Sequence, residues 1–239
     1  NERNTPEVNI STVEDPVEYT LPGIHQVQVI REKGLDFSRA LRSLMRQDPD
    51  IILVGETRDK ETAQTAMEAA LTGHMVFTTL HANDTATAIT RLNEMGIPPY
   101  LVGSSVIGVM AQRLVRKVCV SCAKTKEVTN DDLLASNYKI KKIKIPTIND
   151  NSNETSNVCP ICNGTGYKGR LGLYEVLKIN DNIRELIMKS STADVIREAS
   201  IECGLKTLLD YGMELVKDQL TTIEEVERVC ILEESGDDL

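Results

Sequence analysis

The sequence of 239 residues lacks features that would place it in several broad classes of protein. Its longest apolar stretch, residues 100–110, contains glycines and serines and is too short to cross a lipid bilayer. Positive charge is not in excess, because the formal net charge is −9, and this excludes a general electrostatic affinity for nucleic acid. No signal peptide and no internal repeat can be recognised.

Two catalytic motifs are also missing. No HExxH occurs, and six residues separate His74 from His81, so the histidines do not match a metalloprotease zinc site. No GxxxxGK[ST] occurs, the loop that holds the phosphates of a nucleotide with its backbone N–H groups and lysine. The string GTGYKG at 164–169 satisfies GxGxxG, but a cysteine pair precedes it and a strand-like run follows it. A dinucleotide site needs a strand before and a helix after, so tight turns explain these glycines better.

The remaining composition is that of an ordinary soluble chain. Apolar residues make up 41% and charged residues 26%. Four of the six cysteines form two CxxC pairs, which suits a reducing compartment where thiolates bind metal. We therefore expect an acidic, cytoplasmic protein of mixed α/β structure.

The first half of the chain alternates between strand-like and helix-like segments. Strands are expected at 8–13, 24–29, 51–54 and 76–80, and helices after Asp36, over 60–72 and after Asp84. The strand at 24–29 has the character of an edge strand, whereas those at 51–54 and 76–80 have the character of buried strands. This alternation predicts a mainly parallel, layered sheet.

The second half differs in character from about Cys119 onward. A lysine-rich KIKKIK run at 139–144 and a polar tract at 149–157 lie there, and the polar tract is expected to be a mobile loop. Helices follow, with caps predicted at Asp181 and Thr192 and a capping box formed by Thr222 and Glu225. We expect three parts: a core over 1–118, an insertion over 119–169 and a mostly helical subdomain over 170–239.

The cysteine pairs carry the clearest chemical signal. Two CxxC pairs can complete the thiolate tetrahedron of a closed, structural Zn²⁺ site, and the residues are Cys119, Cys122, Cys159 and Cys162. The 36 residues between the pairs exceed the usual separation of about 15–20, and the polar tract accounts for the excess. A redox pair or unrelated buried cysteines are the alternatives. Cys203 and Cys230 lie in helical segments and are expected in the core.

Acidic and histidine side chains follow three of the expected strands. Glu14, Asp15 and Glu18 follow the first strand, Glu56 follows the strand at 51–54, and His81 follows the strand at 76–80, with His74 just before it. Ligands bind at the carboxyl ends of parallel strands, where carboxylates can hold Mg²⁺ and orient water for phosphoryl transfer. Taken alone, each of these acids is more often a solvated loop residue than a functional one.

Taken together, three stretches resemble a known family. ISTVEDPVEYTLPGIHQV resembles the aspartate box, RQDPDIILVGETRD the modified Walker B motif and GHMVFTTLHAND the histidine box of the secretion ATPase superfamily of GspE/PilB type. This resemblance implies a RecA-like P-loop ATPase core with a tetracysteine zinc insertion and a C-terminal helical region. It also implies hexameric motors of type II secretion and type IV pilus assembly, using ATP, Mg²⁺ and Zn²⁺, that act on a platform protein at the cytoplasmic face of the inner membrane.

The resemblance also implies a role for each residue of the array. Glu18 corresponds to the acid that polarises the attacking water, and Glu56 corresponds to the Walker B acid that supports Mg²⁺ and the water. His74 and His81 correspond to histidines that sense the γ-phosphate.

Three other residues have less defined roles. Glu14 and Asp15 are expected to organise the aspartate box, or to be structural. Arg58 could contact phosphate or a neighbouring subunit, although a surface salt bridge is the simpler expectation.

The missing phosphate loop makes the chain resemble the C-terminal portion of such a motor. In the family this loop precedes the aspartate box, so the chain alone is expected to bind ATP weakly or not at all and the activity to belong to the intact protein. Two alternatives remain open. One is a non-enzymatic zinc module, because CPICNGTG matches a single CxxCxGxG unit of the DnaJ-type chaperones. The other is a different RecA-like transport ATPase, for conjugation or DNA uptake.

Overall fold

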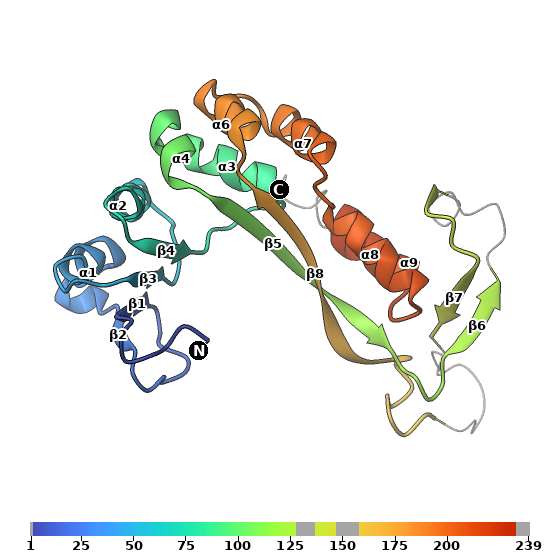
Figure 1. Ribbon diagram of the computed structural model, residues 1–239. Helices are drawn as coiled ribbons and strands as arrows, with labels where there is room; N and C mark the ends of the chain where they lie inside the picture. The colour runs from blue at the N-terminus through green and yellow to red at the C-terminus, as the bar shows by residue number, and fades with distance from the viewer. Residues whose placement is uncertain (1, 128–136, 147–157, 233–239) are drawn as a thin grey trace. The chain divides into compact units, whose positions relative to one another are not determined.

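The computed structural model describes residues 2–127, 137–146 and 158–232 (Figure 1). The chain forms two compact units, one made of Asn1–Val109 with Leu177–Cys203 and the other of Met110–Val176 with Gly204–Leu239. The three-part division expected from the sequence differs from these units, since the helices over 181–202 belong to the first unit. The polar tract at 149–157 lies outside the described residues.

A four-stranded sheet forms the centre of the first unit. Its strands are β1 (Ile10–Glu14), β2 (His25–Gln28), β3 (Ile51–Val54) and β4 (Met75–Thr78). Their order is β2-β1-β3-β4 and every neighbouring pair is parallel. The expected parallel, layered sheet is confirmed, and β2 is an edge strand as its sequence indicates.

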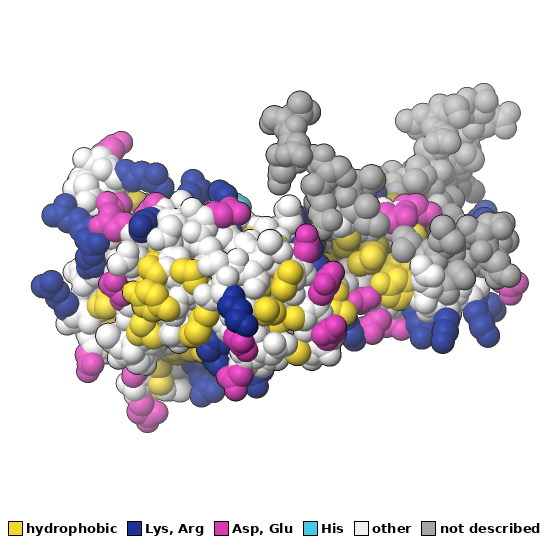
Figure 2. Space-filling model, turned by 90° about the horizontal axis from the view of Figure 1, so that it is seen from above, with side chains coloured by type: hydrophobic (Ala, Val, Ile, Leu, Met, Phe, Trp, Pro, Cys, Tyr) yellow, Lys and Arg dark blue, Asp and Glu magenta, His cyan; other side chains and the backbone are white. Residues whose placement is uncertain are grey.

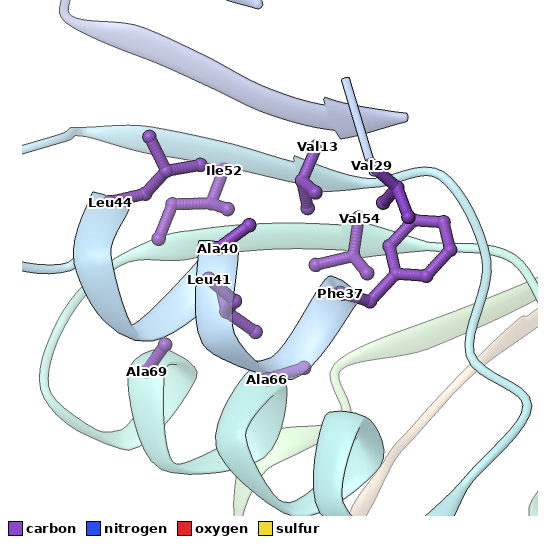
Figure 3. Close-up of a cluster of buried hydrophobic side chains, with 10 residues drawn as sticks. All are labelled: Val13, Val29, Phe37, Ala40, Leu41, Leu44, Ile52, Val54, Ala66 and Ala69. Carbon is purple, nitrogen blue, oxygen red and sulfur yellow. The ribbon is translucent and has the colours of Figure 1, made fainter. Parts of the chain in front are cut away.

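Helices α1 (Phe37–Leu44) and α2 (Lys60–Leu71) pack on one face of this sheet (Figure 1). Asp36 begins α1 by accepting a hydrogen bond from the Arg39 amide at 2.8 Å, as the sequence predicts. The buried side chains of the sheet meet apolar residues of both helices (Figure 3). This core consists of Val13, Val29, Phe37, Ala40, Leu41, Leu44, Ile52, Val54, Ala66 and Ala69.

The other face of the sheet is different, because its side chains line a cavity. Ile51, Leu53 and Phe77 alternate with the core residues and point away from α1 and α2. Phe77 is 49% exposed and its neighbour Met75 is 40% exposed. The prediction that this strand is buried is therefore wrong: β4 is the edge of the described sheet, and its apolar sequence does not reveal which face is covered.

Four further helices complete the first unit: α3 (Thr85–Glu94), α4 (Pro99–Ser105), α6 (Asp181–Met188) and α7 (Ala193–Glu202). The predicted cap at Asp181 is wrong by one residue, because Asn180 accepts the hydrogen bond from the Ile183 amide at 2.9 Å. Thr192 does precede α7, without a side-chain capping bond. Cys203 follows α7 and is exposed, so its expected place in the core is also wrong.

The second unit contains most of a long two-stranded ribbon formed by β5 (Gly108–Val118) and β8 (Tyr167–Lys178). The start of β5, up to Val109, and the end of β8, from Leu177, belong to the first unit. Helices α8 (Leu208–Lys217) and α9 (Ile223–Glu227) follow, and Leu208 packs with Val115 and Leu173 of the ribbon. Strand β6 (Lys124–Glu127) pairs antiparallel with β7 (Lys142–Ile145), so part of the KIKKIK run is a strand. Strand β8 begins at Tyr167, inside the GxGxxG string, where a dinucleotide fingerprint requires a helix, so the string does not have the structural context of that fingerprint.

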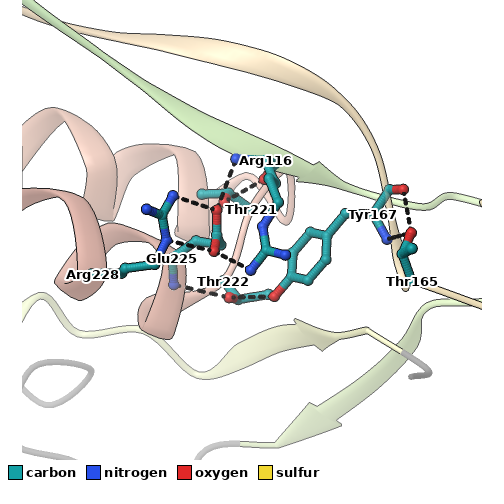
Figure 4. A network of polar contacts seen from close by, with 7 residues as sticks. All are labelled: Arg116, Thr165, Tyr167, Thr221, Thr222, Glu225 and Arg228. Carbon is teal, nitrogen blue, oxygen red and sulfur yellow. Dashed lines mark hydrogen bonds and ion pairs between the residues drawn. The ribbon is translucent and has the colours of Figure 1, made fainter. Parts of the chain in front are cut away.

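A buried carboxylate, Glu225, organises the end of this unit (Figure 4). Thr222 caps α9 by accepting from the Glu225 amide at 3.3 Å, but the Glu225 carboxylate accepts from the Arg116 amide at 3.0 Å and from both the Arg116 and Arg228 guanidiniums. The predicted capping box is therefore only half formed. Although burial opposes the charge, hydrogen bonds from Arg116 and Arg228 lower the pKa of Glu225 to about 2.

The surface mixes apolar and charged side chains. Hydrophobic side chains gather in patches between charges of both signs on the face seen in Figure 2. Within the described parts of the chain, no helix combines the length and the apolar character that crossing a membrane requires.

Candidate functional site

The carboxyl ends of β1, β3 and β4 are joined to one another by hydrogen bonds. The Gly55 amide donates to the Val13 carbonyl oxygen at 2.8 Å, and the Thr57 amide donates to the Thr79 carbonyl oxygen at 2.7 Å. The Thr79 hydroxyl in turn donates to the Gly55 carbonyl oxygen at 2.6 Å. The loops that leave these strands therefore begin at fixed positions on one edge of the sheet.

A cavity of about 900 Å³ lies against this edge and against the face of the sheet that α1 and α2 leave free. The expected acids and one histidine line it together. These residues are Glu14, Asp15, Glu18, Glu56 and His81. The residues that the sequence places at the ends of three strands therefore lie at one cavity in the structure.

The two acids nearest the end of β1 are held by partners within the fold. Glu14 accepts hydrogen bonds from the Thr12 hydroxyl at 2.5 Å and from the Gln26 side chain at 3.0 Å. Asp15 is paired with Arg31 at 3.0 Å. These contacts favour an organising role over a direct chemical one.

Gln26 is a site residue that the sequence analysis missed. It lies opposite Thr12 in the register of β1 and β2, and its amide also donates to the Tyr19 carbonyl oxygen at 3.0 Å. The available signal was the alternating polar pattern of HQVQ, which places both glutamines on the same face of an edge strand.

Glu18 and Glu56 differ in their surroundings. Glu18 is exposed in the cavity, and its carboxylate has no hydrogen-bond partner among the residues that the structure describes. Glu56 is paired with Arg58 at 2.7 Å, and its side chain is 18% exposed against 62% for that of Arg58. The Glu18 carboxylate is therefore accessible to water. Glu56 is held by the ion pair with Arg58, whose long, exposed side chain can swing out into solvent.

The structure does not bring His74 to this cavity. His74 precedes β4, whereas His81 follows it, so the two imidazoles lie at opposite ends of a parallel strand. The Nδ1 atom of His74 is 2.9 Å from the Ala69 carbonyl oxygen and 3.1 Å from the Thr72 hydroxyl. Because a carbonyl oxygen only accepts, Nδ1 carries a proton and donates to the last turn of α2.

The four cysteines of the CxxC pairs form a second candidate site, in the other unit. All four Sγ atoms lie within 4.8 Å of one another, and none forms a disulfide. The Sγ atoms of Cys119 and Cys159 are 4.0 Å apart, and those of Cys122 and Cys162 are 3.6 Å apart. Zn–S bonds of about 2.3 Å in a tetrahedron give sulfur–sulfur distances of about 3.8 Å. The donor set therefore fits Zn²⁺.

The surroundings of these thiols also favour an ion. Backbone N–H groups of Cys162 and Ile161 lower the pKa of Cys159 to about 6. Burial raises the pKa of the Cys122 thiol to about 12, and the neighbouring thiols add to this shift. A divalent cation would offset the cost of burying thiolates so close together.

Comparisons with known proteins identify the family of the chain. The family model described as "Type II/IV secretion system protein" matches residues 1–228. The chain is 46% identical over 222 residues to the type IV pilus assembly ATPase PilB of Thermus thermophilus, covering 93% of this chain and 24% of that protein. It is 43% identical over 228 residues to the type II secretion system ATPase E of Vibrio cholerae, covering 95% of this chain and 44% of that protein. The chain thus spans less than half the length of these relatives.

Solved structures show the same fold. The pilus retraction motor PilT with bound ADP has a TM-score of 0.65 and 26% identity, covering 97% of this chain and 55% of that one. The ATPase DotB of Yersinia pseudotuberculosis has a TM-score of 0.63 at 23% identity, covering 94% of this chain and 49% of that one, which concerns the fold alone.

Proposed function

The chain belongs to the Type II/IV secretion system protein family, and we propose that it is part of an ATP-hydrolysing motor for type IV pilus assembly or type II protein secretion. The observation that carries this proposal is the common cavity lined by Glu18, Glu56 and His81 at the carboxyl edge of a parallel sheet. Hydrolysis is assigned to the intact protein, because the chain has no GxxxxGK[ST] and spans only part of its relatives.

The side chains at the cavity fit a magnesium nucleotide. Carboxylate oxygens are the ligands that Mg²⁺ prefers, and five carboxylates line this cavity, those of Glu2, Glu14, Asp15, Glu18 and Glu56. When bound, ATP with Mg²⁺ would supply the phosphoanhydride bond that is broken. Glu56, at the tip of β3, would help to hold Mg²⁺ after exchanging its ion pair with Arg58, and Arg58 would then be free to meet phosphate or a second subunit.

Glu18 is the acid best placed to act on water. Its exposed carboxylate would accept a hydrogen bond from the attacking water and orient that water toward the terminal phosphate. Glu14 and Asp15 would keep the loop in position through their partners Thr12, Gln26 and Arg31. His81 would contact the γ-phosphate from the tip of β4, and any signal from His74 would have to pass along that strand.

The cysteine cluster would have a structural role. Cys119, Cys122, Cys159 and Cys162 would supply all four ligands of a Zn²⁺ ion, so no position is left open for catalysis. The arrangement resembles the metal-binding insertion of the assembly-type motors, which retraction motors lack, and so favours an assembly or secretion motor.

We also propose the assembly and the cellular place of the intact protein. It would act as a homohexamer at the cytoplasmic side of the inner membrane and would drive a platform protein of the pilus or secretion machine. ATP bound between subunits would make Arg58, which is exposed, a candidate for contact with a neighbouring subunit.

The decisive experiment is steady-state ATPase activity of the intact protein carrying Glu18→Gln. This change keeps the size of the side chain and removes its charge, so turnover should fall by about a hundredfold or more if Glu18 orients the water. Glu32→Gln is the matched control, since Glu32 is exposed, does not line the cavity and should leave turnover unchanged. Unimpaired turnover of Glu18→Gln would show that Glu18 does not orient the attacking water, and the motor mechanism assigned to this cavity would be wrong.

A further inference from the structure

The segment that carries His81 is short and is fixed at its first end. Thr79 accepts a hydrogen bond from the Thr57 amide at 2.7 Å and donates its hydroxyl to the Gly55 carbonyl oxygen at 2.6 Å. The first residue of the segment therefore lies beside the end of β3, hydrogen-bonded to the residues on either side of Glu56. Only residues 80–83 separate this anchor from Asp84, the residue that precedes helix α3.

The second end is fixed by Asp84. Its carboxylate caps α3 by accepting from the Thr87 amide at 2.7 Å, and its side chain is only 12% exposed. Although burial opposes the charge, hydrogen bonds from Thr87 and Arg197 lower the pKa of this carboxyl. Asp84 is therefore a stable anion at the point where the segment becomes a helix.

Arg197 connects this anion to α7. Its guanidinium donates to Asp84 Oδ2 through Nε at 2.9 Å and through Nη2 at 2.6 Å, and its Nη1 donates to Asp194 at 2.5 Å. The neighbouring Ile196 is fully buried, so the backbone that carries Arg197 is packed into the unit. Asp84 and Arg197 are 113 residues apart in sequence.

We propose that Arg197 is a positioning residue: through Asp84 it fixes the segment that presents His81 to the cavity, and it links the state of that segment to α7. The inference rests on the proposed function for its effect on turnover, but not for its effect on the segment itself. Because the segment has only four residues between its two anchors, the backbone that carries His81 has few conformations while both anchors hold. Thr79 directly follows β4 and is bonded to the residues that follow β3, so the Asp84–Arg197 link is the end that can be released.

Two substitutions separate this link from helix capping. Arg197→Gln removes the charge that meets Asp84. Asp84→Asn keeps an oxygen that can accept from the Thr87 amide but loses the charge that holds Arg197. Arg91→Gln is the matched control, because Arg91 also lies on α3 and pairs with Glu94 at the surface.

Hydrogen exchange in the intact protein tests the positioning directly. Amides over 80–84 should exchange about tenfold faster or more in Arg197→Gln and Asp84→Asn, and at the native rate in Arg91→Gln. Native exchange in both link variants would overturn the proposal even if the protein turns out not to hydrolyse ATP. An absence of ATPase activity in the wild type would instead remove the proposed function and leave this result standing.

Turnover then tests the route through His81. Arg197→Gln should lower kcat by about tenfold with KM for ATP nearly unchanged, because an imidazole displaced from the transition state does not weaken binding elsewhere. In a His81→Ala background the same change should have no further effect. If the two losses multiply, Arg197 acts on stability rather than through His81, and the positioning role is wrong. Arg197→Lys, which restores a cation, should recover part of the lost kcat.

Discussion

The amide of Gly55 donates to the carbonyl oxygen of Val13, one residue beyond the last β1–β3 pair, Val13 with Val54. A Cβ atom on Gly55 would lie 3.1 Å from that oxygen and 3.4 Å from the Glu14 Cα atom. The glycine at the end of the apolar run IILV thus lets β3 stay against β1 up to the residue before Glu56. The position of this carboxylate depends on the absence of a side chain next to it.

Replacing Gly55 with alanine should therefore strain the tip of β3. The new methyl group meets backbone atoms, which cannot rotate away, so we expect a loss of about 1–3 kcal/mol in the free energy of unfolding. Urea titration of the wild type and of Gly55→Ala measures it. An unchanged midpoint and slope would show that β1 and β3 accommodate the methyl group without loss of stability, and the proposed fixed geometry of Glu56 would be wrong.

Local chemistry made much of this fold predictable. The caps at Asp36 and Asp84 follow from short acidic side chains placed just before amphipathic segments, and the parallel sheet follows from the alternation of strands and helices. Where two capping residues are adjacent, as with Asn180 and Asp181, the sequence does not decide which one takes the role. The choice depends on where the preceding strand ends.

Contacts between elements that are distant in the chain could not be predicted from the sequence. The apolar run of β4 predicts a buried strand, yet Phe77 is half exposed, because coverage depends on what packs on that face. The placement of His74 depends on the length of β4, since a strand of four residues leaves one histidine at each end. The Asp84–Arg197 pair joins residues that no local pattern connects.

Glu225 predicts how the stability of the second unit depends on pH. Its pKa is lowered from 4.5 to about 2, so its contribution is complete above pH 4.5 and is lost as the pH falls toward 2. Glu225→Gln should cost on the order of 2 kcal/mol at pH 7, because two arginines lose their acceptor. The difference from the wild type should shrink between pH 4.5 and 2.

Denaturant titration at several pH values tests this dependence. Glu94→Gln is the control, because its ion pair with Arg91 is exposed and should contribute little at any pH. A Glu225→Gln deficit that stays constant down to pH 3 would indicate that shape, rather than charge, accounts for the role of Glu225.

The cysteine cluster predicts that the purified protein contains zinc and that the zinc stabilises it. The purified protein should contain about one zinc ion per chain, and Cys162→Ser should lose it and unfold more easily. Cys203→Ser is the matched control, because this exposed thiol lies outside the cluster and its loss should change neither property. Elemental analysis with thermal unfolding measures both. Full zinc content in Cys162→Ser would contradict the four-thiolate site.

The two histidines at the ends of β4 should respond differently to substitution. His74 donates to the Ala69 carbonyl oxygen at the end of α2, so His74→Ala should cost about 1 kcal/mol of stability through one lost hydrogen bond. Its turnover in the intact protein should stay close to that of the wild type. His81 lies at the cavity, so His81→Ala should lower turnover by about tenfold or more while stability stays nearly unchanged. ATPase assays and urea titration of both variants separate the two effects. Equal losses of turnover would mean that His74 senses the phosphate from the far end of the strand, and β4 would then have to transmit that signal along its length.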